Sequence, residues 1–187
     1  MKFTDQSVVV TGGTRGLGRA IALSFLNEGA TVHATYRSNQ EAADSLKDQA
    51  GEHADRLHLH SFDVADYDAV ETFWNGLDEL APDGIQVLVN NAGLRRDSIL
   101  ATMSAENWRM VMDTNLGGSF NMSKFAVQNM VRQRYGRILF IARQTHRHIS
   151  IGGDSDAKPI RFGPYPKLTH RLIHRLQLEE FSFVNIG

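Results

Sequence analysis

The sequence predicts a doubly wound α/β fold with three αβα layers, in which helices cover both faces of a parallel sheet. Through about the first 140 residues, short β-branched runs alternate with longer amphipathic segments, the pattern of strands joined by crossover helices. A glycine-rich turn joins the first apolar run to the first amphipathic segment. A length of 187 residues with 42% apolar residues suits a single domain, residues 1–187, with a sizeable core.

Strands are expected where β-branched and apolar residues cluster between turn signals. They are Ser7–Val10, Thr31–Tyr36, Leu57–Phe62, Gln86–Asn90 and Arg137–Ile141. Because long amphipathic segments separate these strands, we expect the strands to lie parallel to one another.

Start and stop signals place helices between these strands. The first helix is expected at about Gly16–Asn27, and Gly29 would supply the left-handed residue that ends many helices. The stretch Ser38–Glu41 has the pattern of a capping box and predicts the start of the second helix. Asp66 and Ser104 are expected to cap later helices, because their side chains accept hydrogen bonds from free backbone N–H groups.

The composition narrows the classes of function. A formal net charge of −1 gives no support to a nucleic-acid partner or to binding at a membrane surface. The chain has no cysteine, which excludes disulfides and thiolate metal sites and fits a reducing compartment. The start, MKFTDQSVVVTGG, has only a short apolar run, so we expect neither a signal peptide nor a membrane span. The expected location is the cytoplasm.

A change of composition after about Ala142 divides the chain. Residues 1–142 hold 13 Lys or Arg against 17 Asp or Glu, whereas residues 143–175 hold 7 against 2. The second window also contains three of the four prolines and half of the eight histidines. A basic, proline-rich segment is either a solvated loop or an anion-binding loop, and both interpretations stay open.

Histidine pairs such as His58 with His60 lack the further ligands that zinc needs, so no metal site is expected.

The segment VVVTGGTRGLGRAIALSFLNEGA has glycines where a strand passes into a helix. Small residues there allow a tight turn, a close approach of the backbone to a pyrophosphate, and close packing of helix on strand. The helix N-terminus adds free N–H groups and a partial positive charge. A glycine-rich turn alone is also compatible with a simple turn, but its place between strand and helix predicts a dinucleotide site. The residues expected to bind the dinucleotide here are Gly12, Thr14, Arg15, Gly16, Leu17 and Gly18.

The end of the second expected strand, HATYRSN, indicates which dinucleotide is bound. Enzymes that use NAD usually place a carboxylate here to hold the ribose hydroxyls, but this chain has Tyr36, Arg37 and Ser38. Arg37 and Arg15 together would clamp a 2′-phosphate, because a guanidinium group is planar, always charged and complementary to phosphate. The sequence therefore predicts NADP(H) as the cofactor. The alternative is that Arg37 is a solvated residue after a strand.

Four ordered motifs resemble those of the short-chain dehydrogenase/reductase family. They are TGGTRGLG, DV at Asp63–Val64, NNAG at Asn90–Gly93 and TNLGGSFN at Thr114–Asn121. The stretches NNAGLRRDSIL, MDTNLGGSFNMSKF and RQRYGRILFI resemble the bacterial 3-oxoacyl-[acyl-carrier-protein] reductases and acetoacetyl-CoA reductases within it. The likeness covers about residues 5–141, three-quarters of the chain. It implies a Rossmann-type fold from which the last strand or strands would be missing here, and an exposed sheet edge would then impair solubility or assembly.

The resemblance also implies roles for individual residues. Asp63 would accept a hydrogen bond from the adenine amino group, and Val64 would pack on the adenine ring. Asn115 would hold a water of a proton relay through a distortion of its helix. The residues that would line the nicotinamide half of the cofactor and steady the sheet are Asn90, Ala92 and Gly93.

Carbonyl reduction in the family uses a tyrosine that gives the proton, a lysine four residues later, and a serine that orients the substrate. Counted from YGRILFI, the serine, tyrosine and lysine positions fall at Arg143, Asp156 and Ile160. This sequence therefore departs from the family at all three catalytic positions.

Two explanations for this departure stay open. An insertion would make FGPYPKLTH the catalytic segment, with Tyr165 as the acid and Lys167 two residues later, although Pro166 fits only the first turn of a helix. Alternatively the reading frame slips after Ala142, since other frames of the later codons permit triplets that flank the catalytic tyrosine in many relatives. The candidate catalytic residues are Asn115, Tyr165 and Lys167.

Three hypotheses about function follow from the resemblance. The first is an NADPH-dependent reductase that converts 3-oxoacyl thioesters of acyl-carrier protein or CoA to 3-hydroxyacyl forms, as in fatty acid biosynthesis. The second is an NADP-binding module without catalysis that pairs with an intact relative through the helices around Asn107–Arg134. The third is a truncated or frame-shifted product with no selected function.

The resemblance also implies a homo-oligomer, a dimer or a tetramer. The arginines Arg132, Arg134 and Arg137 would meet an acidic carrier protein or simply lie at a solvated helix end.

Overall fold

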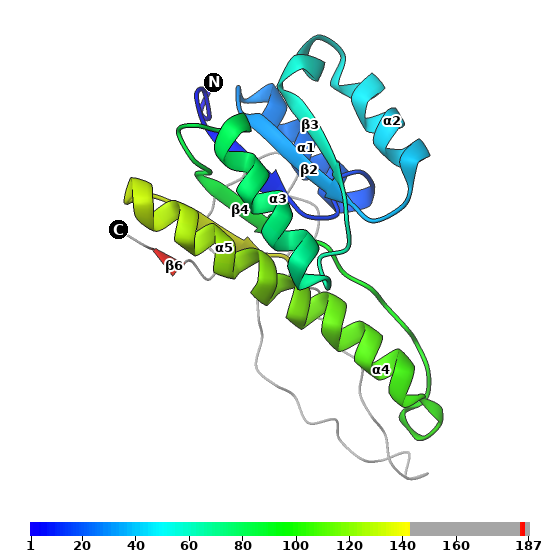
Figure 1. Ribbon diagram of the computed structural model, residues 1–187. Coiled ribbons are helices and arrows are strands. Elements are labelled where there is room, and N and C mark those ends of the chain that lie inside the picture. Colours follow the sequence, from blue (N-terminus) through cyan, green and yellow to red (C-terminus); the bar gives the residue numbers. More distant parts are fainter. Residues whose placement is uncertain (143–183, 186–187) are drawn as a thin grey trace, which may run out of the picture. The chain divides into compact units, whose positions relative to one another are not determined.

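A parallel sheet of five strands lies at the centre of the residues that the computed structural model describes, 1–142 and 184–185 (Figure 1). The strands are β1 (Ser7–Val10), β2 (Thr31–Tyr36), β3 (Leu57–Ser61), β4 (Val87–Asn90) and β5 (Arg137–Phe140). Their order is β3-β2-β1-β4-β5, and each neighbouring pair is parallel. A two-residue strand, β6 (Val184–Asn185), pairs antiparallel with β5. The predicted parallel sheet is confirmed, and each predicted strand boundary lies within one residue of the observed one.

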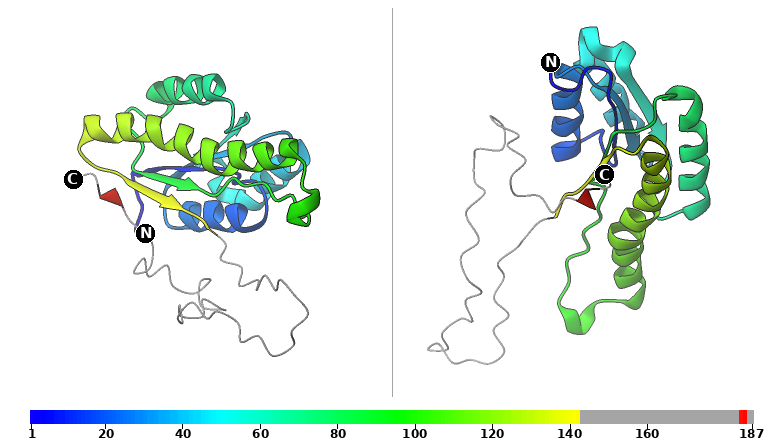
Figure 2. Two further views of the ribbon diagram at one scale, coloured as in Figure 1. Left: turned by 90° about the horizontal axis from the view of Figure 1, so that it is seen from below. Right: turned by 90° about the vertical axis from the view of Figure 1, so that its left-hand side faces the viewer.

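Helices cover both faces of the sheet, as predicted for a three-layer fold. The α-helices α1 and α2 lie on one face, whereas α3 and α5 lie side by side on the other (Figures 1 and 2). The α-helices are α1 (Gly16–Asn27), α2 (Gln40–Ala50), α3 (Tyr67–Leu80), α4 (Ala105–Met112) and α5 (Gly118–Gln133). The shorter helices are the 3-10 turns η1 (Gly51–Arg56) and η2 (Leu100–Thr102) and the π-helical turn η3 (Asp113–Gly117).

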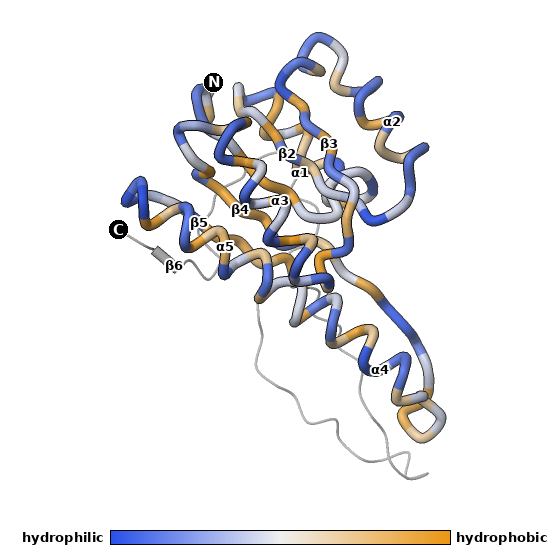
Figure 3. Tube along the Cα trace, viewed as in Figure 1, coloured by the Kyte–Doolittle hydropathy of each residue, from blue (hydrophilic) through white to orange (hydrophobic). Residues whose placement is uncertain are grey.

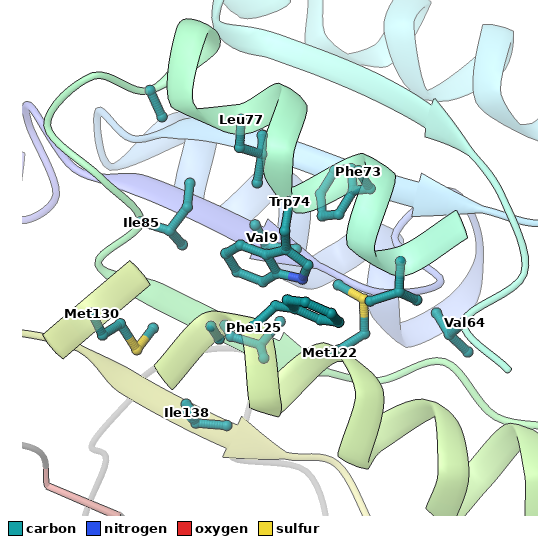
Figure 4. Packing of buried hydrophobic residues seen from close by; sticks show 14 residues of the cluster. Val9, Val64, Phe73, Trp74, Leu77, Ile85, Met122, Phe125, Met130 and Ile138 are labelled. Atoms are coloured by element: carbon teal, nitrogen blue, oxygen red, sulfur yellow. The ribbon is translucent and has the colours of Figure 1, made fainter. Parts of the chain in front are cut away.

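The central strands are apolar along their length because helices cover both of their faces. Val8, Val9 and Val10 of β1 are fully buried, and the tube in Figure 3 shows β4 as similarly apolar. Between the sheet and the pair α3 and α5, a cluster of side chains interdigitates around Trp74 and Phe125 (Figure 4). Burial of each large apolar side chain in such a cluster contributes about 1.5–3 kcal/mol. The cluster therefore holds α3 and α5 to the sheet.

Three predicted helix ends are confirmed. Gly29 has a φ of +100° and follows the last turn of α1, where a residue with a Cβ would be strained. The side chain of Asp66 accepts a hydrogen bond from the N–H of Ala69 at 3.1 Å, at the start of α3. The hydroxyl of Ser104 accepts one from the N–H of Asn107 at 3.1 Å, at the start of α4. These caps satisfy backbone donors that have no partner within the helix.

The capping box predicted at Ser38–Glu41 is wrong. Asn39 is the N-cap of α2, because its Oδ1 accepts a hydrogen bond from the N–H of Ala42 at 2.9 Å. Asparagine and serine cap helices about equally well, so local preference does not choose between neighbouring positions. A local side-chain contact of the first turn accompanies the observed N-cap, since the Tyr36 hydroxyl donates to Oε1 of Gln40 at 2.6 Å.

Three histidines pack together on the sheet face that α3 covers. His33 of β2 is fully buried, its Nδ1 lies 3.2 Å from Nε2 of His60 in β3, and its ring stacks on His58 with centroids 4.9 Å apart. The ring of His60 meets Phe73 of α3 edge-on. Among the described residues, none of the three rings forms an ion pair, and Nε2 of His33 has no hydrogen-bond partner. Burial, with a smaller contribution from the neighbouring histidines, lowers the pKa of His33 to about 3 and that of His60 to about 4.

We expect this cluster to make the fold sensitive to acid. In the unfolded chain a histidine binds a proton near pH 6.5, whereas the folded chain keeps His33 neutral down to a pKa of about 3. Between these values the unfolded state holds more protons, so the free energy of unfolding falls as the pH falls. For His33 this loss amounts to about 2 kcal/mol between pH 7.5 and 5.

Urea unfolding of the wild type and of His33→Leu at pH 7.5 and pH 5 measures this effect. The variant should lose less stability than the wild type on acidification, because it removes one buried histidine. The matched control is His53→Gln, which removes a histidine of η1 outside the cluster. If the free energy of unfolding falls equally in His33→Leu and in the wild type on acidification, the buried His33 is not a cause of the acid sensitivity.

Candidate functional site

A cavity of about 590 Å³ opens at the carboxyl ends of the strands, where β1 and β4 lie side by side. The chain leaves β1 toward one face of the sheet and leaves β4 toward the other, and this divergence creates a crevice. The wall is formed by the turn after β1, the end of β2, the segment after β3 and the loop after β4, with Thr114 of η3. The cavity is therefore at the place where doubly wound sheets bind their ligands.

Most residues predicted to bind a dinucleotide meet at this cavity. Those that line it are Gly12, Thr14, Arg15, Gly16, Leu17, Gly18, Arg37, Asp63, Val64, Ala92 and Gly93. The remaining lining residues are Thr35, Tyr36, Ser38, Asn39, Phe62, Asn91, Leu94 and Thr114.

The glycines of the turn after β1 are required by the backbone. Gly12 and Gly16 have φ values of +61° and +54°, in the left-handed region that favours glycine. A Cβ at Gly18 would lie 2.2 Å from the Gly12 carbonyl oxygen and 2.5 Å from Nδ2 of Asn91. Only glycine therefore lets the first turn of α1 pack this closely on the turn after β1.

The N-terminus of α1 is open toward ligands of the cavity. Arg15 precedes the helix, and its side chain makes no capping hydrogen bond to the first turn. The first N–H groups of a helix have no partner within it and carry a partial positive charge. Because Gly16, Leu17 and Gly18 line the cavity, this end of α1 offers backbone donors to an anion such as a pyrophosphate.

A buried threonine joins the turn after β1 to the loop after β4. The Oγ1 of Thr11 accepts hydrogen bonds from the N–H groups of Asn91 and Ala92, both at 2.9 Å. The side-chain amide of Asn91 donates hydrogen bonds to the carbonyl oxygens of Thr11 at 2.9 Å and Gly12 at 3.2 Å. Sequence reasoning assigned no role to Thr11 or Asn91, although both lie inside the quoted motifs TGG and NNAG. Their hydrogen bonds keep two walls of the cavity at a fixed separation.

Arg37 and Asp63, predicted to bind different parts of the cofactor, form an ion pair. Nε of Arg37 lies 3.2 Å from Oδ2 of Asp63, and the arginine side chain is largely exposed. The other carboxylate oxygen of Asp63 accepts the N–H of Ala65 at 3.0 Å. Arg37 and Arg15 both line the cavity, so two guanidinium groups are present where a negative ligand group would lie.

Asn90 does not line the cavity. It is buried at the end of β4, and its Nδ2 donates to the hydroxyl of Ser123 in α5 at 3.0 Å. Asn90 therefore ties β4 to α5, while the following residues Asn91, Ala92 and Gly93 form the wall.

Asn115 lies in the π-helical turn η3, so the expected helix distortion is present at this residue. Its Oδ1 accepts the N–H of Leu94 at 2.7 Å, and its Nδ2 donates to the Leu94 carbonyl at 3.0 Å. The Asn115 carbonyl accepts a hydrogen bond from the Ser119 hydroxyl at 2.7 Å. The side chain thus holds the loop after β4, which lines the cavity at Leu94.

The predicted acid and its companion, Tyr165 and Lys167, lie outside the described residues, as do Arg143, Asp156 and Ile160. Residues 1–142 thus bring together the predicted cofactor-binding residues and Asn115. Within the described ranges, no group of three or more His, Cys, Asp or Glu is arranged to hold a metal ion. No helix there is long and apolar enough to cross a membrane.

The chain is similar to known proteins of one family. The model of the short chain dehydrogenase family matches residues 6–152. The chain is 40% identical over 135 residues to an acetoacetyl-CoA reductase of Paracoccus denitrificans, covering 72% of this chain and 53% of that protein. It is 33% identical over 142 residues to the 3-oxoacyl-[acyl-carrier-protein] reductase FabG of Aquifex aeolicus (76% and 57%) and 35% identical over 143 residues to that of Escherichia coli (75% and 56%). The chain thus spans a little over half the length of these curated relatives.

Close packing of α1 on the glycine turn predicts the effect of a methyl group at Gly18. We expect Gly18→Ala to lower the free energy of unfolding by about 1–3 kcal/mol, because α1 or the turn must move to admit the Cβ. The control is Gly76→Ala in α3, where nothing lies within 4 Å of the added Cβ. That change should be neutral or raise stability by about 0.5–1 kcal/mol. Urea unfolding of both variants measures the difference, and equal effects would show that the packing at Gly18 is unimportant.

Proposed function

The chain belongs to the short-chain dehydrogenase family, and from this premise we propose that it is an NADPH-dependent reductase of 3-oxoacyl thioesters. The substrate would be carried by acyl-carrier protein or CoA and converted in the cytoplasm to the 3-hydroxyacyl form. The observation that supports this proposal most directly is the cavity beside the glycine turn, with an open helix N-terminus and two arginines on its wall. The names of the matched relatives supply the proposed substrate class.

The residues of the cavity fit a dinucleotide phosphate. A side chain at Gly18 would collide with the Gly12 carbonyl, so the turn presents bare backbone to the cavity. The N–H groups at the start of α1 would hold the pyrophosphate. Arg37 and Arg15 would hold a 2′-phosphate, and no carboxylate stands at the end of β2 to favour unphosphorylated ribose. This combination favours NADP(H) over NAD(H).

The rest of the cofactor would follow the walls of the cavity. We assign the adenine to the side of Asp63 and Val64, and the nicotinamide half to the side of Ala92 and Gly93, with Asn90 behind it in β4. When bound, the cofactor supplies the hydride for carbonyl reduction. The Arg37 guanidinium and an adenine amino group would share the carboxylate of Asp63, because its Oδ1 already accepts a backbone N–H.

The proton for the developing alkoxide must come from the chain or from water. We propose that Tyr165 donates this proton and that the ammonium group of Lys167 supports it. Asn115 would act in the relay through its backbone carbonyl, which lies in the π-helical turn and accepts the Ser119 hydroxyl. The side chain of Asn115 would meanwhile hold the loop after β4 against the cofactor.

A second candidate function is an NADP-binding module without catalysis. It is favoured by the residues at the aligned catalytic positions, Arg143, Asp156 and Ile160, which do not supply the family's serine, tyrosine and lysine. The proposed assembly in either case is a homo-oligomer or a pair with an intact relative. Exposed apolar side chains on α4, η3 and α5 suit such an interface, and they include Trp108, Leu116 and Phe120. A slipped reading frame after Ala142 is tested directly by resequencing the gene.

The choice of cofactor is tested by measuring dissociation constants for NADPH and NADH. The wild type should bind NADPH more tightly than NADH. Arg37→Gln should weaken the binding of NADPH by about tenfold to a hundredfold, because a charge-assisted contact is lost, and should change the affinity for NADH little. The control is Arg109→Gln, which removes an exposed arginine of α4 outside the cavity. Equal affinity of the wild type for the two dinucleotides contradicts the proposed preference.

The two candidate functions differ in turnover. NADPH consumption with acetoacetyl-CoA should be detectable in the wild type and should fall at least a hundredfold in Tyr165→Phe, since the variant loses the proposed proton donor. The matched control is Tyr135→Phe, in which a tyrosine after α5 loses its hydroxyl outside the cavity. Binding of NADPH without turnover by the wild type would favour the binding module instead.

A further inference from the structure

Two residues of α5 hold the wall of the cavity that follows β3. The side chain of Asn121 is 7% exposed, and its Nδ2 donates to the carbonyl oxygen of Val64 at 3.0 Å and lies 3.5 Å from that of Ala65. Gly118, one turn earlier in α5, packs against Val64 so closely that a Cβ there would lie 2.6 Å from Cγ2 of Val64. The helix thus touches this segment through a hydrogen bond and through a contact that only glycine permits.

The segment depends on these contacts because the sheet no longer holds it. Strand β3 ends at Ser61, and the last backbone bond to the neighbouring strand joins the N–H of Phe62 to the Tyr36 carbonyl at 2.9 Å. The next residue, Asp63, bonds to Ala65, to the exposed Arg37 and, through its carbonyl oxygen, to the N–H of Asp66 at the start of α3. Val64 is buried in the core cluster and appears beside α5 in Figure 4. Helix α5 therefore helps to set the position of residues 63–64, together with the start of α3.

We propose that Asn121 and Gly118 are positioning residues for the base-binding side of the cofactor site. They hold Asp63 and Val64, both of which line the cavity, in the place where the adenine would lie. This inference rests on the proposed function, since it assumes that the cavity binds NADP(H). It adds that α5 and the π-helical turn before it brace two walls of the cavity. Asn121 of α5 holds the segment after β3, and Asn115 of the turn holds the loop after β4.

A second buried asparagine of α5 serves as the control that separates an effect on the cofactor site from a general loss of stability. Asn129 is also 7% exposed, and its Oδ1 accepts the N–H of Ile85 at 2.8 Å. It does not line the cavity. Asn121→Ala and Asn129→Ala therefore each remove one buried hydrogen bond between a side chain and the backbone, but only Asn121 faces the cavity wall.

The first experiment measures binding of adenosine 2′,5′-bisphosphate and of NADPH to the full chain by titration calorimetry. We expect Asn121→Ala to weaken the binding of both ligands about tenfold and Asn129→Ala to weaken it less than twofold. Both variants should lower the urea midpoint by similar amounts. If the wild type shows turnover, Asn121→Ala should raise the KM for NADPH and leave kcat unchanged. Equal weakening by the two variants, or none by Asn121→Ala, overturns the inference while the proposed function stands.

A second pair of variants covers the case in which Asn121→Ala does not fold. Gly118→Ala places a Cβ against Val64, whereas Gly117→Ala meets only the Met112 carbonyl at 3.8 Å, an ordinary contact. We expect Gly118→Ala to weaken adenosine 2′,5′-bisphosphate at least fivefold and Gly117→Ala to leave it unchanged. The same affinity in both variants overturns the inference. A wild type that binds neither the bisphosphate nor NADPH overturns the proposed function, and this inference with it.

Discussion

The pairing of β1 with β4 connects parts of the chain that are about eighty residues apart, and the candidate site depends on it. Val8 to Val10 lie beside Val87 to Val89 in parallel register, and all are buried or nearly so. Because the chain leaves these two strands toward opposite faces of the sheet, their following loops diverge and leave the cavity between them. Thr11 then joins the two loops with its buried hydroxyl. The apolar sheet thus creates the cavity, and a small polar network fixes its width.

Helix α5 contributes to this site although it begins only after the motifs that bind the cofactor in the proposed function. Its buried face packs into the core with Met122 and Phe125, and its polar exceptions on that face are asparagines that bond to backbone outside the helix. Asparagine is suited to this use because its amide offers both donor and acceptor at a short reach. The positions of Val64 and of Ile85 therefore depend on how α5 packs on the sheet.

The buried histidines on β2 and β3 lie close to the same site. The ring of His60 contacts Phe73, Phe73 contacts Phe62 at a centroid distance of 4.8 Å, and Phe62 lines the cavity. In the sequence, His58 and His60 suggested at most an incomplete metal pair. Stacking with His33 was not predicted, because His33 belongs to a different strand and meets them only through the register of β2 with β3. The low pKa values of His33 and His60 follow mainly from the burial of these two rings.

The strands, both ends of α1, the starts of α3 and α4 and the glycine turn were predictable from the sequence alone, because they depend on neighbours in the chain. Alternating apolar runs, a positive φ at Gly12 and caps such as Asp66 are local properties. The cap of α2 was misplaced by one residue where two local choices had nearly equal energy.

Contacts between segments that are distant in the chain depend on the folded structure. Examples are the ion pair of Arg37 with Asp63, the bond of Asn121 to Val64 across 57 residues, and the turning of Asn90 away from the cavity. No periodicity encodes such pairs, because their partners meet only after the strand order and the packing of α5 are set.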